Sequence, residues 1–596
     1  EKVIRRLKTI IDHEDIENVL RVGFESLDEN EQSQFLHIAV FFSCEDGDLV
    51  KAMLADTKFD IKHGLEILVN RSLIYISTGG KIMMHKLLQQ VATKVVHREE
   101  SWKQRILINA PEICDVLERA KGTRAVSGIS FDISGIGEVS VSKKAFKRMP
   151  NLRFLRVYKS EYDGNDALHI PEEMEFPCRH LRLLQWKAYP NKFLPPAFHP
   201  EYLVKLDMSR SKLKYLWKGT QPLTNLKEMY LGRSFHLKEL PDLTNATNLE
   251  KLYLNRCKSL VEIPSSFSHL HKLETLVMAY CMSIKVIPPH LNLASLDYLN
   301  MDGCTKLRNF PAMSTHIRNL TMSFTAVKDV PASTRLCSRL DTLDLSWNRK
   351  LKEISHLPRS LTQLNLSGSN IKKITESIKD LHQLSKLYLC GCKRLTSLPE
   401  LPRSLTYLFA DDCESLETVL NFPFNTQGGK FYFTNCFKLD QLTQRAITLP
   451  SLGSGHTRLP GREVPAEFKH RARGNSLTIR LDGNRPLHIS FKLCFVISPN
   501  NKNGSWNSES VVCRRIVNGH LDPYDEGFHR NHDFGSHCRT EHLFVFDSNL
   551  QYFHSGKVSS EVVFEFSSRF LQQVVILECG AHIQSINESE PLEDDA

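Results

Sequence analysis

Five histidine and cysteine side chains gather in one short stretch near the carboxyl end of this 596-residue sequence. They are His529, His532, His537, Cys538 and His542. Imidazole and thiolate groups are common zinc ligands, so this stretch could in principle hold a metal ion. Its spacing matches no strong zinc pattern, and His542 begins a run typical of a β-strand. The sequence therefore predicts no metal site.

Two other kinds of chemistry lack their defining motifs. No G-x-S-x-G turn is present to expose a nucleophilic serine. No G-x-x-x-x-G-K-S/T loop is present, so the sequence offers no cradle for a nucleoside triphosphate and its magnesium. We predict that this chain is not an enzyme and that it holds no cofactor of its own.

The composition of the chain excludes several other classes of protein. The formal net charge of +9 is too small for this length to indicate nucleic-acid binding. No run of 18 uncharged apolar residues occurs, so no membrane-spanning helix is expected. Fifteen cysteines without a dense pattern favour reduced thiols, and hence the cytoplasm or the nucleus. Because the sequence begins with Glu1 and not with Met, we expect it to be a piece of a longer protein.

The elements that must position any binding site are repeats. The pattern L-x-x-L-x-L, with other apolar residues sometimes replacing Leu, starts at positions 152, 181, 203, 226, 249, 273, 296, 317, 340, 361, 384 and 405. From position 181 to position 405 the mean step is about 22 residues, which lies within the period of leucine-rich repeats. Because one coil cannot bury its own apolar face, neighbouring coils must stack. The sequence predicts a solenoid over residues 126–425 with a parallel sheet on its concave side.

The register of the repeat separates core positions from solvent-facing positions. The fourth and sixth positions share one face of a short strand and point inward. The ninth position holds Cys257, Cys281, Cys304, Cys392 and Cys413. We interpret these thiols as small buried groups that hydrogen-bond weakly to backbone, and not as metal ligands or disulfide partners.

The third, fifth and seventh positions point out of the concave sheet, where a solenoid usually binds its partner. Exposed tyrosines on such a face offer a large contact area with a polar tip. The candidate binding residues are Tyr230, Tyr253, Tyr298, Asn300, Asp344, Tyr388 and Tyr407. We predict that this face binds a protein.

The repeats are flanked by two different modules, so we predict an α/β multidomain chain. Helical spacing followed by two short strands around Gly79 and Gly80 indicates a winged helix over residues 1–100, and a helical linker is expected over 101–125. Alternating apolar runs divided by Gly, Pro and Asn indicate an antiparallel β-sandwich over 430–580. Residues 581–596 should form an acidic tail.

Several motifs resemble a known family. Residues 20–27 and 35–42, the run Met84-His85-Lys86-Leu87 and the repeat entry at 145–152 resemble plant intracellular immune receptors of the TIR-NB-ARC-LRR (TNL) class. The resemblance implies that residues 1–100 are the winged-helix end of the NB-ARC nucleotide switch. It also implies that residues 430–580 are the post-repeat jelly-roll/Ig-like domain (C-JID), and that His85 contacts the β-phosphate of ADP.

The same resemblance implies a function. The chain would be the sensor portion of a disease resistance protein that binds a pathogen effector, or a guarded host protein, through the concave face and the C-JID. It would relay binding to an ADP/ATP switch through contact with an NB-ARC core absent from this sequence. The full-length receptor would oligomerise on activation, and its NAD-cleaving TIR domain would lie upstream.

Two alternatives remain open at this stage. A cell-surface or adhesion protein is permitted by the sequons at Asn245 and Asn319, although such triplets also arise by chance. An adaptor of a ubiquitin ligase would also use a leucine-rich solenoid. Either would be a protein-binding scaffold unrelated to nucleotide switching.

Overall fold

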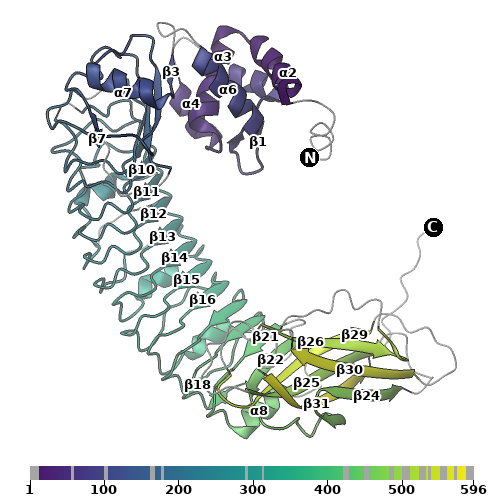
Figure 1. The fold of residues 1–596 in the computed structure, drawn as a ribbon. Helices are drawn as coiled ribbons and strands as arrows, with labels where there is room; N and C mark the ends of the chain where they lie inside the picture. The colour runs from purple at the N-terminus through teal and green to yellow at the C-terminus, as the bar shows by residue number, and fades with distance from the viewer. Residues whose placement is uncertain are drawn as a thin grey trace, which may run out of the picture. The chain divides into compact units, whose positions relative to one another are not determined.

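The structure is a computed structural model (Figure 1). It describes residues 13–55, 60–98, 105–160, 168–175, 180–196, 198–288, 293–311, 314–420, 429–448, 455–481, 489–499, 510–521, 532–533, 538–550, 560–568 and 574–585. The chain forms two compact units. Unit 1 comprises Glu1–Leu307 with Pro311–Ser314, and unit 2 comprises Arg308–Phe310 with Thr315–Ala596.

Unit 1 begins with a helical module that carries a small hairpin. Its elements are α2 (His13–Glu25), α3 (Glu29–His37), the π-helix η1 (Ile38–Phe42), α4 (Gly47–Leu54), α5 (Ile61–Asn70), β1 (Tyr75–Ile76), β2 (Ile82–Met83) and α6 (Lys86–Arg98). Asp28 caps α3 by accepting from the backbone N–H of Glu31, whose side chain accepts from the Asp28 N–H in return. β1 and β2 pair antiparallel. The predicted winged helix is confirmed.

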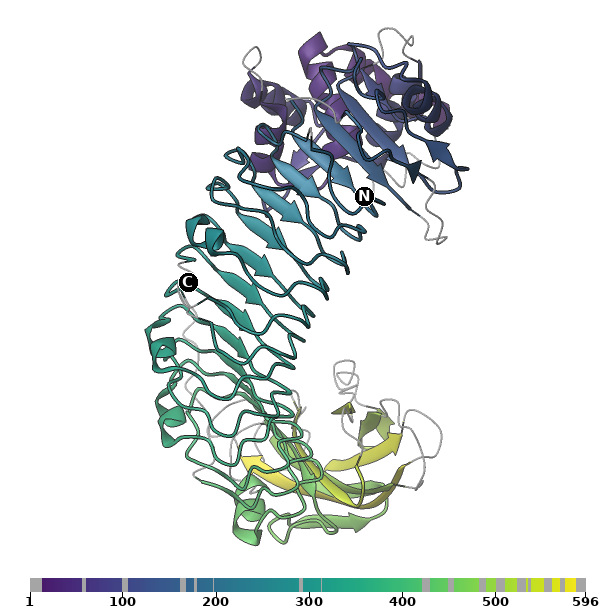
Figure 2. The same cartoon turned by 90° about the vertical axis from the view of Figure 1, so that its left-hand side faces the viewer.

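The parallel sheet of unit 1 follows. Its strands are β3 (Ile106–Leu107), β4 (Gly128–Asp132), β6 (Phe154–Tyr158), β8 (Leu183–Trp186), β9 (Lys205–Asp207), β10 (Glu228–Tyr230), β11 (Lys251–Tyr253), β12 (Thr275–Val277) and β13 (Tyr298–Asn300). All of them pair parallel with their neighbours, and the strand arrows point to one edge (Figure 2). The region predicted as a linker, 101–125, contains helix α7 (Ala110–Arg119) but also β3. Because β3 pairs with β4, the sheet begins before residue 126.

The strands have the predicted register. In β11, β12 and β13 the middle residue is buried and its two neighbours are half-buried. Leu252 lies opposite Leu276, which lies opposite Leu299, so these leucines form a continuous row inside the coils. The side chains that flank the row face away from the core. The predicted solenoid with a parallel sheet is therefore confirmed.

Unit 2 contains further coils of the same kind. Its strands are β14 (Asn319–Thr321), β15 (Thr342–Asp344), β16 (Gln363–Asn365), β17 (Lys386–Tyr388), β19 (Tyr407–Phe409) and β21 (Gly429–Tyr432), all parallel. β22 (Gly455–Pro460) pairs parallel with β21 and antiparallel with β29 (His542–Leu550). This one strand thus continues the repeat sheet into the next domain.

That domain consists of two antiparallel sheets. The first contains β22, β29, β25 (Ile489–Pro499), β31 (Val574–Ser585) and β23 (His470–Arg473). The second contains β24 (Ser476–Leu481), β30 (Ser560–Ser568), β26 (Ser510–Val517), β27 (His520–Leu521) and β28 (His532–Asp533). Phe491 meets Phe564 edge to face at 5.1 Å between the sheets. β31 runs to Ser585, so it includes the start of the predicted tail 581–596, and residues 586–596 lie outside the described ranges.

The ninth-position cysteines are buried and join one coil to the preceding one. Each thiol donates to a backbone carbonyl of the preceding coil, with Sγ···O distances of 3.3, 3.1, 3.3, 3.2, 3.1 and 3.0 Å for Cys257, Cys281, Cys304, Cys392, Cys413 and Cys436. Burial raises the pKa of Cys257 and of Cys304 to about 12, so both thiols keep their protons. All six cysteines are free. Their role is structural, as the sequence predicts for the first five; Cys436 lies beyond the predicted repeats and adds a sixth.

Adjacent residues of β13 test this register. Leu299→Ala removes a buried side chain and should lower the free energy of unfolding by about 2–5 kcal/mol. Tyr298→Ala alters the half-buried, solvent-facing position next to it and should change that free energy by about 0.5 kcal/mol. Chemical denaturation of both variants gives the comparison. Equal losses for the two variants would show that the assigned faces are wrong.

Candidate functional site

The first predicted binding residues lie on the solvent-facing side of unit 1. Tyr230 and Tyr253 are half-buried and stack with ring centroids 4.7 Å apart and planes 7° from parallel. The Tyr230 hydroxyl donates to Glu228 at 3.0 Å, and burial raises the pKa of Tyr230 well above its ordinary value. Tyr298 is also half-buried, and its hydroxyl accepts from the Asn300 amide at 3.3 Å. The four predicted residues of unit 1 thus share one face.

In unit 2 the predicted tyrosines belong to a larger aromatic group. Tyr388 stacks on Phe409 at 5.1 Å, and Tyr407 stacks on the same ring at 6.3 Å. Tyr432 meets Phe409 edge to face at 5.2 Å. Lys386 lies over the Tyr407 ring, with 5.8 Å between Nζ and the centroid. These rings form a half-buried apolar surface with a cation beside it.

Two of the predicted binding residues also have a structural task. The Asn300 side chain accepts from the backbone N–H of Asp302 at 3.0 Å, and Asp344 accepts from the N–H of Ser346 at 2.8 Å. Asp344 also accepts from the Asn365 amide of the next coil at 3.0 Å. Each side chain therefore holds the turn that ends its own strand. The repeat pattern alone does not reveal this second role.

The winged helix packs on the solvent-facing side of the first coils. Arg156, at the fifth position of its repeat, donates to the backbone carbonyls of Val40, at 2.7 Å, and of Phe41. Arg182 donates to the Ala52 carbonyl at 2.8 Å. At this end of unit 1 the face predicted to bind a partner is thus covered by the chain itself.

A charged network continues from this contact along the sheet. Lys205 contacts Glu45 of the winged helix at 2.8 Å and Glu228 of the next coil at 3.2 Å. Lys251 contacts Glu228 at 2.9 Å. Although burial opposes ionisation of Glu228, the two lysines outweigh it and lower the pKa of this carboxyl. The Lys205 ammonium also lies 5.2 Å from the centroid of the Tyr230 ring.

This contact was not predicted, but the sequence carries a signal for it. Phe154 and Leu183 occupy third positions, which should face solvent, and both are apolar. Both are buried in the core of the winged-helix module. Phe154 meets Phe42 edge to face at 5.1 Å. Apolar residues at outward positions of successive repeats therefore indicate a covered coil.

A buried histidine lies in the same contact. His37 is 5.1 Å from the Phe154 ring, its Nδ1 lies 2.6 Å from the Ser33 carbonyl, and its Nε2 lies 3.0 Å from Ser127 Oγ. Burial lowers the pKa of His37 from 6.5 to about 4. The ring is therefore neutral near pH 7, and its Nδ1–H donates to the carbonyl.

The predicted nucleotide contact, His85, lies at the start of α6. Its side chain is exposed, and Nδ1 accepts from the backbone N–H of Leu87 at 3.2 Å. A neutral ring that accepts at Nδ1 carries its proton on Nε2. That N–H has the chemistry needed to donate to a phosphate oxygen.

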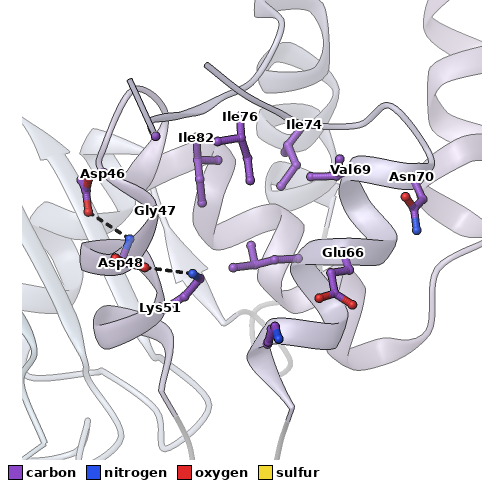
Figure 3. A pocket seen from close by; sticks show the side chains of 13 residues that line it. Asp46, Gly47, Asp48, Lys51, Glu66, Val69, Asn70, Ile74, Ile76 and Ile82 are labelled. Carbon is purple, nitrogen blue, oxygen red and sulfur yellow. Dashed lines mark hydrogen bonds and ion pairs between the residues drawn. The ribbon is translucent and has the colours of Figure 1, made fainter. Parts of the chain in front are cut away.

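The winged helix also contains a cavity of about 550 Å³ (Figure 3). Ile74, Ile76 and Ile82 supply apolar lining, and charged groups come from α4 and α5. Among the latter, Lys51 donates to Asp48 at 2.9 Å. The lining includes neither His85 nor any of the solvent-facing tyrosines, so the cavity is separate from both predicted sites.

In unit 2 the sandwich is joined to the last coils by a buried ion pair. Arg458 of β22 contacts Asp411 at 2.7 Å, and their side chains are 6% and 4% exposed. The Arg458 guanidinium also lies 4.1 Å from the centroid of the Tyr432 ring. Nearby, Arg539 contacts Glu414 at 2.9 Å. Asp411 occupies a solvent-facing repeat position, so the sandwich covers part of the face here too.

The histidine and cysteine stretch is only partly described. Residues 529 and 537 lie outside the described ranges. The His542 Nδ1–H donates to the Thr540 carbonyl at 2.8 Å, while Nε2 accepts from the Asn435 N–H at 2.9 Å. Burial raises the pKa of Cys538 to about 12. Because both His542 nitrogens already have partners, this histidine joins the sandwich to a coil and offers no lone pair to a metal.

Comparisons with known proteins agree with this architecture. The sequence profile described as "Disease resistance protein Roq1-like, winged-helix domain" matches residues 28–101, and two leucine-rich-repeat profiles match residues 202–221 and 248–270. Two Arabidopsis thaliana proteins, disease resistance protein RML1B and disease resistance protein RML1A, are 54% and 53% identical over 99% and 92% of this chain. The chain spans 57% and 55% of their lengths.

Solved structures give only distant matches. A leucine-rich-repeat protein of Leptospira interrogans is 17% identical, the match covers 60% of this chain and 95% of that protein, and the TM-score is 0.33.

In the part of the chain that the structure describes, no helix is both long enough and apolar enough to cross a membrane.

The buried His37 makes stability depend on pH. Its folded pKa of about 4 lies below the ordinary 6.5, so the unfolded chain binds the proton first. Stability should be highest above pH 6.5 and fall as pH drops towards 4, by roughly 3 kcal/mol from this residue. Denaturant unfolding of the winged helix at several pH values measures the loss. His37→Gln should flatten this dependence, and the exposed His271→Gln should not.

The buried ion pair gives a second prediction. Arg458→Ala leaves the Asp411 carboxylate buried without its partner and should destabilise unit 2 by about 3–5 kcal/mol. Arg462→Ala, whose side chain is 86% exposed and 3.9 Å from Glu541, is the matched control and should cost about 1 kcal/mol or less. Thermal unfolding distinguishes the two. Similar midpoints for both variants would contradict the role given to Arg458.

Proposed function

This chain belongs to the plant disease resistance proteins of the TNL class, and we propose that it is the sensing portion of an intracellular immune receptor. In this proposal the leucine-rich repeats and the sandwich bind a pathogen effector or a guarded host protein. The winged helix passes that event to a nucleotide switch in the remainder of the receptor. The relatives are disease resistance proteins, which favours this function over a surface or adaptor scaffold.

The observation that carries the proposal is the aromatic surface on the strands of unit 2. Tyr388, Phe409 and Tyr407 are only half-buried, although they stack on one another. Large rings with a polar tip are typical of the residues that dominate protein–protein binding. The coil that carries Tyr407 and Phe409 also carries Asp411, which contacts Arg458, so a partner on these rings would also lie close to the sandwich.

A relay is supported by the contacts in unit 1. Tyr253 stacks on Tyr230. The Lys205 ammonium lies over the Tyr230 ring and also contacts Glu45 of the winged helix. A partner that displaces the Tyr253 ring would disturb each of these contacts in turn. Binding shifts a switch only if the partner prefers one of its two states. Here the preferred state is the one in which the Lys205 contact is weakened.

His85 fits the nucleotide role that the family implies. It is exposed, and its Nε2–H has the polarity that an ADP phosphate oxygen requires. When bound, the nucleotide would supply the phosphate charge to which the switch responds. Within this chain His85 would contribute one donor, fixed in orientation by the Leu87 N–H, and the other nucleotide contacts would come from the rest of the receptor.

The remaining properties follow from this proposal. The receptor acts in the cytoplasm or the nucleus, where the buried free thiols of the coils remain reduced. The full-length receptor oligomerises when its switch opens. No step of this proposal requires chemistry by the chain itself.

Binding measurements with purified pathogen effectors test the proposal. For an effector that binds the chain, Tyr388→Ala with Tyr407→Ala should weaken affinity by at least about 30-fold, because two anchoring rings are removed. Biolayer interferometry gives the affinities. The control is Leu336→Ala with Leu442→Ala, which truncates exposed residues of the same unit outside the strands. An effector that binds the tyrosine variant as tightly as the native chain would rule out this surface.

A further inference from the structure

Successive coils of unit 1 turn through left-handed residues three positions after the ends of their strands. The eighth position of the repeat holds Arg210, Arg233, Arg256 and Tyr280, with φ of 64°, 63°, 64° and 61°. Three arginines therefore occupy equivalent turns of three neighbouring coils. All four side chains are exposed.

Hydrogen bonds between the coils fix this row. The Arg210 N–H donates to the Gly232 carbonyl at 2.8 Å, and the Arg233 N–H donates to the Asn255 carbonyl at 2.6 Å. The Arg256 N–H donates to the Ala279 carbonyl at 2.6 Å. Each turn thus extends the parallel ladder by one bond, and the arginines are spaced as the strands are, about 4.8 Å apart.

Folding alone does not favour arginine at this position. A left-handed backbone is strained for residues with a Cβ and free of strain for glycine. Three other coils place glycine there, namely Gly303, Gly368 and Gly391, with φ of 69°, 68° and 71°, while others hold Ala188, Phe324 and Trp347, with φ of 59°, 54° and 58°. Arginine in three coils in succession therefore incurs a strain that the fold does not require.

A second row reinforces the first. The tenth position of the same coils holds Lys212, Phe235, Lys258 and Met282, all exposed. The Arg256 guanidinium lies 5.2 Å from the centroid of the Tyr280 ring, and the Lys258 ammonium lies 5.2 Å from that of Phe235. From the seventh to the tenth position, none of these four coils carries Asp or Glu. We call Arg210, Arg233, Arg256, Lys212 and Lys258, with Phe235 and Tyr280, the edge ladder.

We infer that the edge ladder is a second protein-binding surface, and that its partner presents a row of carboxylates along one face of an α-helix. Guanidinium groups bind carboxylates through two parallel hydrogen bonds. Side chains three or four residues apart on a helix are about 5–6 Å apart, which is close to the spacing of the ladder. The exposed rings of Phe235 and Tyr280, 46% and 41% exposed, would contact apolar groups beside the carboxylates. The edge ladder uses the eighth and tenth positions of the repeat, whereas the proposed function uses the third, fifth and seventh. This inference therefore does not depend on the proposed function.

Fluorescence anisotropy with the full chain tests the inference. The probe is a labelled alanine-rich helical peptide with glutamates at every fourth position, and its comparison is an isomer of equal composition with the glutamates scattered around the helix. The ordered peptide should bind more tightly. Arg233→Gly with Arg256→Gly should weaken its binding by at least about tenfold. Because glycine suits a φ of 63° or 64°, the thermal unfolding midpoint of this variant should not fall.

The control for a general effect of positive charge is the double variant Lys238→Gln with Lys285→Gln. Both lysines are exposed on unit 1 outside the edge ladder, and the pair removes the same two charges. This variant should bind the ordered peptide as the native chain does. Equal loss in both variants, equal affinity for the two peptides, or no binding would overturn the inference. Tighter binding of a single-stranded oligothymidylate than of either peptide would overturn it in favour of a nucleic-acid surface.

Discussion

The surfaces of the repeat region depend on the bonds that one coil makes to the next. The Leu254 carbonyl accepts from the thiol of Cys281 in the following coil, and the Leu254 N–H donates to Val277 of that same coil. The Leu254 carbonyl also accepts from the Cys257 N–H of its own coil, but the bonds to Cys281 and Val277 form only when the next coil is in place, so a single repeat cannot fold alone. This stacking sets the distances between the tyrosines of neighbouring coils and between the residues of the edge ladder.

Each unit uses part of its solvent-facing strand surface to hold another module of the chain. In unit 1, Arg156 and Lys205 join the winged helix to the coils. In unit 2, Asp411 joins the sandwich to the coils through Arg458. Both contacts use charged side chains at positions that would otherwise face water, and burial makes their pairing obligatory. A partner has only the remaining positions available in each unit.

The sequence predicted the features that have a local pattern, such as the repeats and the winged helix, and missed contacts between residues far apart in the chain. Leu252, Leu276 and Leu299 recur at a fixed spacing, so their shared row could be read directly. The contact of Arg156 with Val40 joins residues 116 positions apart, and no local pattern encodes such a pairing. Asn300 and Asp344 lie on the predicted face, but their bonds to the following turns depend on backbone geometry. Whether these two residues bind a partner stays a prediction.

The contact between Arg156 and the end of the π-helix η1 has a consequence for natural variation. Arg156 binds main-chain oxygens, of Val40 and Phe41, and every amino acid supplies that oxygen. Mutation of the two helix residues therefore leaves the acceptors in place, while loss of the one arginine removes both bonds. Among inherited variants, polymorphism at residue 40 should therefore be tolerated by this joint. Constraint should fall on residue 156, and also on residue 41, because the buried Phe41 ring packs 5.5 Å from Phe154.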